Sequence, residues 1–403
     1  METQNRLGSR IAFGVCGGIA AYKAAESVRL LSQAGHDVHT ITTQWGARFI
    51  GPLTLEALSG NPCISSDAID GSMRHIALMR EVDLLLVAPL TAETLAKFAH
   101  GHADHLLTQS YLAFRGPVVV FPAMNTAMLE HPATQRNLDQ LRADGVRVIL
   151  GESGALACGE TGPGRMAEPE LIAEVVESVL TQPLPGLKGA RVLVTAGPTR
   201  EALDPVRYLT NRSSGRMGLA LARALRNAGA IVTLVHGPIN ERLPWGTENV
   251  AVTSAAQMAD AVLSRADDQD VLVLCAAVAD YAPVYAAQKL KKDQFDGQLK
   301  LNRTQDILAS LGQRKRTDQI LVGFAAESEN VTANARRKLE SKNLDLIFAN
   351  DISRPDGGFE GTENALFALG PNGFCMDLGH HSKTELATQI TSIINTKRTT
   401  GTL

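Results

Sequence analysis

The sequence lacks the features that define several broad classes of protein. No apolar run approaches the roughly 18 residues that a membrane-spanning helix needs. The opening residues METQNRLGSR lack the basic start and the long apolar segment of a secretory signal, so we expect a cytoplasmic protein. The formal net charge is only −3, and acidic and basic residues are interspersed. This balance gives no support to a role on nucleic acid or at a membrane surface.

Cysteine is scarce as well. The five cysteines form an odd, dispersed set without a CxxC pair: Cys16, Cys63, Cys158, Cys275 and Cys375. A disulfide framework and a structural zinc site are therefore disfavoured, and a cysteine with a function would act as a thiol. The histidine-rich stretch HGHADH, at residues 100–105, does not bring three imidazoles together on a helix. A polar connection between helices explains it better than a metal site.

What the sequence does contain is an alternation of strands and helices. Its 403 residues exceed what one hydrophobic core usually supports, so we expect two domains of about 200 residues each. In the first half, RIAFGVCGG is typical of a strand that enters a glycine turn, and residues 19–33 have helical spacing before Gly35. The runs DVHTITT, DLLLVAP, PVVVFP and VRVIL then alternate with helical stretches. This pattern predicts a parallel sheet with helices on both faces and ligands at the carboxyl ends of its strands.

The second half starts the same pattern again. The stretch TQPLPGLKGA, from Thr181, is typical of a linker, and RVLVTAGPTR begins a new strand and glycine loop. We place the boundary near residue 187, which gives domains 1–186 and 187–403. Near the end, ALFALGPNGFCMDLG predicts a hairpin with its turn at residues 371–373, followed by a last helix from Lys383. The sequence thus predicts an α/β protein with two doubly wound parallel-sheet domains.

The glycine loops exclude two common nucleotide sites. GVCGGIAAYKA and the loop that begins TAGPTR suit a phosphate at a helix N-terminus, although a plain tight turn is equally compatible with either. Neither loop is GxGxxG or GxxxxGK[ST], so a dinucleotide fingerprint and a Walker-type site are disfavoured. Where an NAD ribose needs an acidic residue, the chain has Thr42-Thr43 in the first half and His236-Gly237 in the second.

Several polar residues stand where a ligand of such sheets would bind. Asn125 follows the apolar run PVVVF, and it is either a helix cap or a ligand-binding amide. Cys158 lies in the glycine-rich stretch 152–170, which is either disordered or a lid, and its thiol is functional or a bystander. The lysine run KLKK (residues 289–292) and the pair Lys338 and Lys342 are either solvated faces or phosphate ligands.

Many collinear motifs resemble one family. In the first half they are GGIAAYK, the pair His75-Ile76, APLTAET, PAMNTAM and ACGETGPGRM. In the second they are VTAGPTREALDPVRYLTNRSSGRMG, AAVADY, KLKK, VGFAAES and a KxxxK helix. Over nearly its whole length the chain resembles the bacterial bifunctional enzymes of coenzyme A biosynthesis, in which phosphopantothenoylcysteine decarboxylase is fused to phosphopantothenate–cysteine ligase.

For the first half, the resemblance implies a flavodoxin-like decarboxylase domain that binds FMN. Loss of the substrate carboxylate needs an electron sink, which the flavin provides by reversible oxidation of the substrate thiol. By match, His75 is the base of the oxidation step, Cys158 the proton donor of the reduction step, and Asn125 the ligand of the substrate carboxylate. The residues that match the family's FMN site are Gly17, Gly18, Ile19, Thr42, Ala88, Thr91 and Met124.

For the second half, the resemblance implies a Rossmann-like ligase domain that uses CTP and Mg²⁺. 4′-Phosphopantothenate would attack the α-phosphate of CTP, and the amine of cysteine would displace CMP from the acyl-cytidylate. By match, Asn211 holds the carboxylate or the acyl-cytidylate, and Lys289 stabilises charge during its formation or breakdown. The residues that match the CTP site are Ala276, Asp280, Lys289, Gln305, Asp306, Ile307, Leu308, Phe324, Lys338 and Lys342. The metal ligands stay unassigned.

The resemblance also implies an oligomeric assembly, and Glu93 is a departure from the family pattern. Family members assemble as trimers grouped into dodecamers, with the FMN site shared across a subunit contact, and their ligase halves dimerise. Glu93 stands where the family usually has Asn, and we expect its side chain to point outwards because a carboxylate beside the flavin would be unfavourable. Two alternatives remain open: an NAD-dependent oxidoreductase, which the missing fingerprint disfavours, and a flavin-binding regulatory protein, which would not need Cys158, the lid and Lys289 together.

Overall fold

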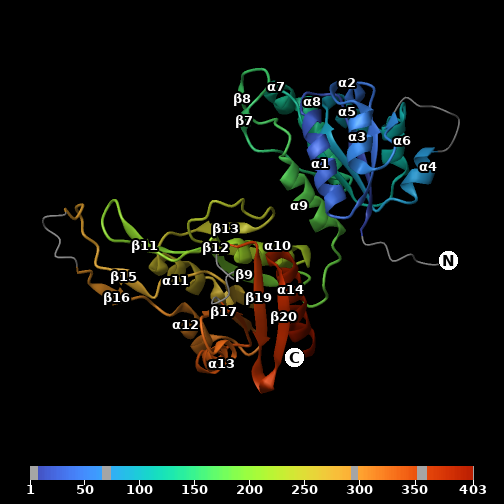
Figure 1. Ribbon diagram of the computed structural model, residues 1–403. Helices are drawn as coiled ribbons and strands as arrows, with labels where there is room; N and C mark the ends of the chain where they lie inside the picture. The colour runs from blue at the N-terminus through green and yellow to red at the C-terminus, as the bar shows by residue number, and fades with distance from the viewer. Residues whose placement is uncertain (1–7, 66–73, 292–297, 352–360, 403) are drawn as a thin grey trace. The chain divides into compact units, whose positions relative to one another are not determined.

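The chain folds into two compact units, residues 1–180 and residues 181–403 (Figure 1). The computed structural model describes residues 8–65, 74–291, 298–351 and 361–402. Each unit has a sheet of mainly parallel strands covered by helices on both faces, so the predicted fold class is confirmed. Among the described residues, no helix is long and apolar enough to cross a membrane.

The sheet of the first unit is parallel throughout. Its order is β3 (Ile64–Ser65), β2 (Asp37–Thr42), β1 (Arg10–Val15), β4 (Leu84–Leu90), β5 (Val118–Pro122) and β6 (Arg147–Val148). Strand β4 is buried along its whole length, as its uninterrupted apolar sequence requires when helices cover both faces. The chain order reverses between β1 and β4, and in doubly wound sheets ligands bind at the carboxyl ends of the strands on either side of such a point.

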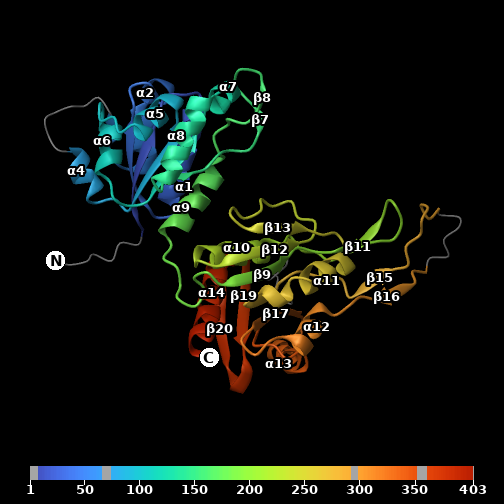
Figure 2. The same ribbon diagram turned by 180° about the vertical axis from the view of Figure 1, so that it is seen from behind.

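Helices cover this sheet in two groups. Contacts join α1 (Ala21–Gln33) to α3 (Pro52–Ser59) and α9 (Pro169–Leu180), and a second set joins the remaining longer helices. That second set is α4 (Arg74–Met79), α5 (Ala92–Ala99), α6 (Leu106–Ala113) and α8 (Pro132–Ala143), while α2 (Gly46–Phe49) and α7 (Thr126–Glu130) are short helices at strand ends. A small hairpin, β7 (Gly154–Ala155) with β8 (Thr161–Gly162), lies beside α7 in both views (Figures 1 and 2).

The sheet of the second unit is longer and mixed. Its order is β13 (Glu248–Ala251), β12 (Ile231–His236), β9 (Arg191–Ala196), β14 (Val271–Leu274), β17 (Ile320–Glu327), β18 (Leu346–Asp351), β19 (Glu363–Leu369) and β20 (Cys375–Ser382). The pairs β18–β19 and β19–β20 are antiparallel, and the others are parallel. The predicted terminal hairpin is confirmed: its turn falls at Pro371–Gly373, where Asn372 and Gly373 have positive φ.

Helices again lie on two faces. On one side α10 (Arg216–Asn227) packs against α14 (Lys383–Thr400), which begins at the predicted residue because Ser382 and Glu385 form a capping box. The other side holds α11 (Ala255–Leu263), α12 (Ile307–Arg314) and α13 (Val331–Ser341). Two small hairpins that the sequence did not predict are β10 (Arg200–Ala202) with β11 (Tyr208–Thr210), and β15 (Tyr281–Pro283) with β16 (Leu301–Arg303). They project from the sheet as one arm (Figures 1 and 2).

Candidate active sites

The first unit has a cavity of about 750 Å³ at the carboxyl ends of its strands. Its walls come from the turn after β1, the loop after β2, the start of α5, the end of β5 and the stretch 155–166. This is the switch-point position at which doubly wound sheets bind their ligands. A volume of several hundred cubic ångströms suits a cofactor together with part of a substrate.

One wall of this cavity is the glycine turn that leads into α1. An added Cβ at Gly17 would stand 2.2 Å from the Cβ of Trp45, so only glycine fits there. No side chain caps the N-terminus of α1, which leaves backbone N–H groups and the positive end of the helix dipole for an anion. Lys23, one turn into the helix, is buried, and its Nζ lies 2.8 Å from Oε1 of Glu168. The turn therefore has the donors that a phosphate group needs.

Asn125 serves both purposes that the sequence left open. Its Oδ1 accepts a hydrogen bond of 2.9 Å from the N–H of Ala127, so it caps α7. Its Nδ2 points the other way, 2.7 Å from Oε2 of Glu160 and 3.4 Å from Sγ of Cys158. Because the cap uses only the oxygen, the amide N–H groups are directed to the strap side of the cavity, where Glu160 and Cys158 now accept from them.

The glycine-rich stretch that carries Cys158 is ordered against the rest of the unit. Its returning arm is fixed where the N–H of Met124 donates to the carbonyl of Gly164 at 3.0 Å and the hydroxyl of Thr126 donates to the carbonyl of Pro163 at 2.8 Å. Gly164 has φ 119°, and a Cβ there would meet the carbonyl oxygen of Met124 at 2.2 Å. The stretch therefore behaves as a strap that holds the exposed Cys158 over the cavity.

The structure brings together most of the residues predicted for this site. Those that line the cavity are Gly17, Gly18, Ile19, Thr91, Met124, Asn125 and Cys158. Two predicted FMN residues do not line it: Thr42 and Ala88 are fully buried inside β2 and β4, and Thr43, the next residue after β2, lines the cavity instead. His75 lies in α4, partly buried, and is not among the lining residues of this chain.

The rim of the cavity carries a group of charges. Lys97 lies 2.7 Å from Asp104 and 3.1 Å from Glu93, and the hydrogen bond that it donates to Asp104 raises the pKa of this lysine. The Glu93 side chain is 67% exposed but still lines the cavity. The prediction that Glu93 points outwards is thus right in that the side chain is exposed, and wrong in that the side chain still lines the cavity. His105 caps α6 through its Nδ1, and the described residues hold no cluster suited to a metal ion.

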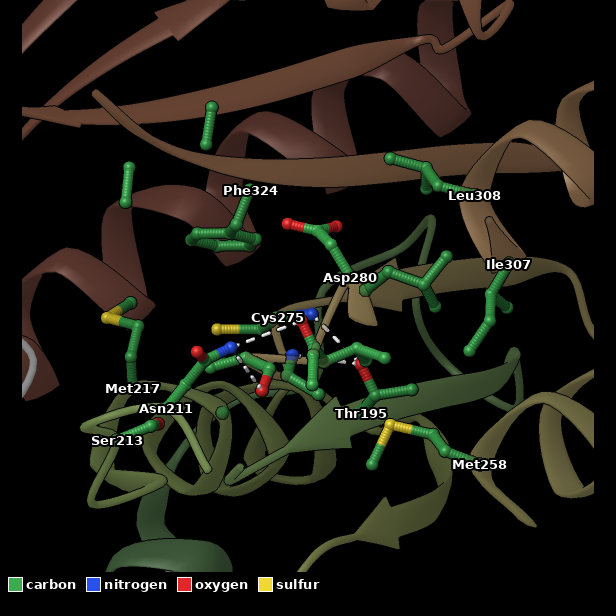
Figure 3. Close-up of a pocket in the computed structure, with 18 of the residues that line it drawn as sticks. Thr195, Asn211, Ser213, Met217, Met258, Cys275, Asp280, Ile307, Leu308 and Phe324 are labelled. Carbon is green, nitrogen blue, oxygen red and sulfur yellow. Dashed lines mark hydrogen bonds between the residues drawn. The ribbon is translucent and has the colours of Figure 1, made fainter. Parts of the chain in front are cut away.

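The second unit has its own cavity of about 680 Å³, again at the carboxyl ends of the strands (Figure 3). Asn211 follows β11, and its Nδ2 donates to the carbonyls of Ala277 and Val278, each at 3.2 Å. Asp280 lies between Phe324 on one side and Ile307 and Leu308 on the other (Figure 3). The amide of Asn211, the carboxylate of Asp280 and the apolar side chains of Phe324, Ile307 and Leu308 therefore line the same cavity.

Two lysines of this cavity are held by internal ion pairs. Lys338 lies 2.7 Å from Glu327, and Lys342 lies 2.8 Å from Asp306. Asp306 also caps α12 by accepting from the N–H of Ala309 at 2.9 Å. Burial opposes the ionisation of Asp306, but the contacts with Lys342 and Ala309 outweigh it and lower the pKa of this carboxyl. An anionic ligand would have to share or displace these partners.

All predicted CTP residues line the second cavity except one. The lining residues are Ala276, Asp280, Gln305, Asp306, Ile307, Leu308, Phe324, Lys338 and Lys342, together with Asn211. Lys289 is exposed and does not line it. Sequence reasoning missed the basic and polar lining residues Arg216, Arg303, Asn350, Asn364 and Lys383. Arg303 and Arg216 had a local signal, since Arg303 lies two residues before the predicted stretch 305–308 and Arg216 lies in the same motif as Asn211, whereas Asn350, Asn364 and Lys383 come from elements distant in sequence.

A thiol stands in each cavity, but the two differ in state. Cys275 follows β14 and lines the second cavity, and burial raises the pKa of its thiol to about 12. A thiol of that kind stays protonated and is a poor nucleophile or acid. Cys158 of the first cavity is exposed on its strap. Among the described residues that line the two cavities, the thiol exposed to a ligand is therefore that of Cys158.

Comparisons with known proteins agree on both halves. The family described as Flavoprotein matches residues 1–181, and the one described as DNA/pantothenate metabolism flavoprotein C-terminal domain matches residues 187–397. A similar relative is the coenzyme A biosynthesis bifunctional protein CoaBC of Vibrio vulnificus (strain YJ016). It is 44% identical over 98% of this chain and 99% of that protein. The corresponding protein of Escherichia coli (strain K12) is 43% identical over 91% of this chain and 92% of that protein.

Among solved structures, the C-terminal domain of a coenzyme A biosynthesis bifunctional protein CoaBC is similar. It is 40% identical, covers 52% of this chain and 96% of that chain, and has a TM-score of 0.45.

Proposed function

The chain belongs to the family of coenzyme A biosynthesis bifunctional proteins, which are enzymes with a flavoprotein decarboxylase domain and a ligase domain, and from that premise we propose its two reactions. The second unit joins 4′-phosphopantothenate to cysteine at the expense of CTP. The first unit decarboxylates the resulting phosphopantothenoylcysteine to 4′-phosphopantetheine with the help of FMN. The observation that carries the proposal is the contact of the Asn125 amide with the Cys158 thiol beside an uncapped glycine turn.

The residues of the first cavity fit FMN. The turn at Gly17 and Gly18 leaves backbone donors for a phosphate at the start of α1, and Ile19, Trp45 and Met124 offer apolar surface for a planar ring. Bound FMN would supply the two-electron chemistry that gives the departing carboxylate an electron sink.

The chain's own groups then bind and move protons. Asn125 Nδ2 donates to the substrate carboxylate, in place of its present acceptor Glu160, and orients the bond that breaks. Cys158 delivers a proton to the product carbon, and the strap that carries it keeps water from the reacting atoms. His75 takes a proton from the substrate. Because it does not line the cavity of its own chain, we propose that a neighbouring copy supplies it, in an assembly built on trimers.

In the second cavity, the proposal gives each charged group a role toward CTP. The carboxylate of 4′-phosphopantothenate, held by Asn211, attacks the α-phosphorus, and pyrophosphate leaves; the amine of cysteine then displaces CMP. Lys338, Lys342 and Arg303 contact the phosphates, and Lys289 stabilises the charge that develops during transfer.

The donor set of this cavity also fits Mg²⁺. The ion usually binds one or two carboxylates together with substrate phosphates and water. Asp280 and Asp306 provide carboxylates, and the described residues form no closed metal cage of three or more such ligands. Mg²⁺ would therefore bind together with the triphosphate. We also propose that the ligase half dimerises, as in its family.

Two measurements on the purified protein test the proposal. A flavin absorption band that tracks protein concentration supports FMN in the first cavity. Pyrophosphate release that requires CTP, 4′-phosphopantothenate and Mg²⁺, followed by appearance of the cysteine adduct, supports ligation in the second. A colourless protein that cannot be loaded with FMN, or release that proceeds equally with ATP and without the acyl substrate, would contradict it.

A further inference from the structure

A buried aspartate joins two segments of the arm that projects from the second sheet. Asp204 lies in the turn between β10 and β11, and none of its side chain is exposed. Its Oδ1 accepts from the N–H groups of Val206 and Arg207, each at 2.8 Å. This pattern closes the turn that Asp-Pro sequences favour, and an asparagine could make it equally well.

The second oxygen has a different task. Oδ2 of Asp204 accepts from Nη2 of Arg207 at 2.5 Å and from the backbone N–H of Leu290 at 3.2 Å. Nη2 of Arg207 also donates to the carbonyl of Leu290 at 2.9 Å. Both backbone groups of Leu290 are thus fixed to the turn, and a further bond joins the N–H of Ala286 to the carbonyl of Leu203 at 2.9 Å. The turn therefore holds a stretch of chain that lies 83 to 86 residues away in sequence.

The residue next to this anchor is Lys289. Its side chain is exposed, and within the described part of the chain it makes no hydrogen bond or ion pair. The hydrogen bonds of the Leu290 backbone consequently fix the position of the Lys289 backbone, from which the lysine side chain reaches a ligand. The hairpin that contains Asp204 ends at Thr210, and the next residue, Asn211, lines the second cavity.

We propose that Asp204 is a positioning residue for Lys289: through Leu290 it fixes the lysine relative to Asn211, so that both reach the same acyl-transfer centre. The inference rests on the proposed role of Lys289 in ligation. The hydrogen bonds from Arg207 hold the pKa of Asp204 well below its usual range, so the anchor keeps its charge at neutral pH.

The variant Asp204→Asn tests this directly. An asparagine keeps the bonds of Oδ1 that close the turn, but the amide that replaces Oδ2 cannot accept from Leu290 or Arg207. We expect kcat for ligation to fall by about tenfold or more, because small displacements of a catalytic group are costly, while KM for CTP changes by less than about threefold. Decarboxylation by the same protein should be unchanged, which shows that the first unit is intact.

A matched control is Asp270→Asn. This carboxylate also anchors backbone, accepting from the N–H of Arg191 at 2.8 Å, and it pairs with Arg398 outside the cavity. We expect ligation in this variant to stay within about twofold of the parent, whatever its effect on thermal stability. An equal loss of ligation in both variants would overturn the positioning role.

The hydrogen bonds that hold Leu290 can also be tested by a measurement that does not depend on activity. Trypsin cleavage of the Lys289–Leu290 bond, followed by mass spectrometry, should be at least about threefold faster in Asp204→Asn and unchanged in Asp270→Asn, because only the former frees Leu290. Equal cleavage rates in the parent and Asp204→Asn would contradict the anchor. If Asp204→Asn does not fold, Arg207→Met removes the donor that Asp204 and the Leu290 carbonyl share, and the same faster cleavage is expected.

A double-mutant cycle separates this inference from the proposed function. If Asp204 acts through Lys289, then adding Asp204→Asn to Lys289→Gln should cause no further loss of ligation. Full additivity would overturn the positioning role and leave the function of Lys289 untouched. Normal ligation by Lys289→Gln alone would instead refute the proposed role of Lys289, and with it this inference.

Discussion

The two cavities differ in how far their reactive groups are assembled within one chain. In the first, the Asn125 amide and the Cys158 thiol are already 3.4 Å apart, held by the cap of α7 and by the strap. In the second, Lys338 and Lys342 are occupied by ion pairs, and Lys289 lies outside the cavity. The first cavity therefore has its amide and its thiol in contact and must exchange only the Asn125–Glu160 hydrogen bond for the substrate carboxylate, whereas the second must exchange two lysine ion pairs for contacts with phosphate.

The thiols sharpen this contrast. Cys158 is exposed on a strap, while Cys275 is only partly exposed, and the burial of its thiol raises its pKa so that it stays protonated. A group used as an acid must be reachable by substrate, and a group that only fills space need not be. The variants below should therefore affect one reaction and spare the other.

The largest effect is expected at Asn125. Asn125→Asp keeps the oxygen that caps α7, and aspartate is an equally good cap, so the fold should be retained. It replaces the donor that faces the substrate carboxylate with a negative charge, beside Glu160. We expect decarboxylation to fall by at least about 100-fold while ligation is unchanged, measured by carbon dioxide release and by adduct formation. Normal decarboxylation would remove Asn125 from the site.

The next effect is expected at Lys289. Lys289→Gln removes a charge from an exposed side chain, so stability should not change. If this lysine stabilises the transferring group, ligation should fall by about 100-fold, with decarboxylation of added phosphopantothenoylcysteine intact. The measurement is steady-state pyrophosphate release. An unchanged rate would mean that the second cavity works without the lysine run.

A smaller effect is expected at Lys342. Lys342→Met leaves the Asp306 carboxylate unpaired near the nucleotide, so KM for CTP should rise by about tenfold, a cost of about 1.4 kcal/mol. Lys315→Met is a matched control, because Lys315 pairs with Asp345 at the same 2.8 Å but does not line the cavity. Equal changes of KM in the two variants would show that the ion pair acts through stability alone.

The smallest effect is expected at Cys275. Because burial raises its pKa to about 12, the thiol stays protonated up to pH 9 and contributes no ionisation in that range. Cys275→Ala should keep ligation within about threefold of the parent, with the same pH profile between pH 7 and 9. A change in the shape of that profile would show that this thiol titrates and takes part.

Much of the fold could be predicted because its strands are buried on both faces. Runs such as the one in β4 are apolar throughout, and that pattern survives without knowledge of the partners. The hairpins β10–β11 and β15–β16 escaped because they are three residues long and largely exposed, as β16 is along its whole length. Strands this short leave too little of an alternating pattern to be recognised in the sequence.

In both sites, only residues that belong to a recognisable sequence motif could be predicted. Motif matching found Asn125 and Cys158, but their contact depends on a strap that brings residues 33 apart in sequence together. It also selected Thr42 and Ala88, whose side chains are buried within their strands. Successive side chains of a strand point to opposite faces, so a motif position that is one residue off selects a side chain with a different direction. Asn364 and Lys383 were missed, since only the folded chain shows that they line the second cavity.

The central claim is that one chain carries two separable sites, and a mixing experiment tests it most directly. Asn125→Asp and Lys289→Gln proteins are each supplied with 4′-phosphopantothenate, cysteine, CTP, Mg²⁺ and FMN, and the products are identified by mass spectrometry. The account predicts that the first accumulates phosphopantothenoylcysteine, the second makes almost no adduct, and an equal mixture makes 4′-phosphopantetheine. A mixture that stops at the same point as either variant alone, or a single variant that loses both reactions, would contradict it.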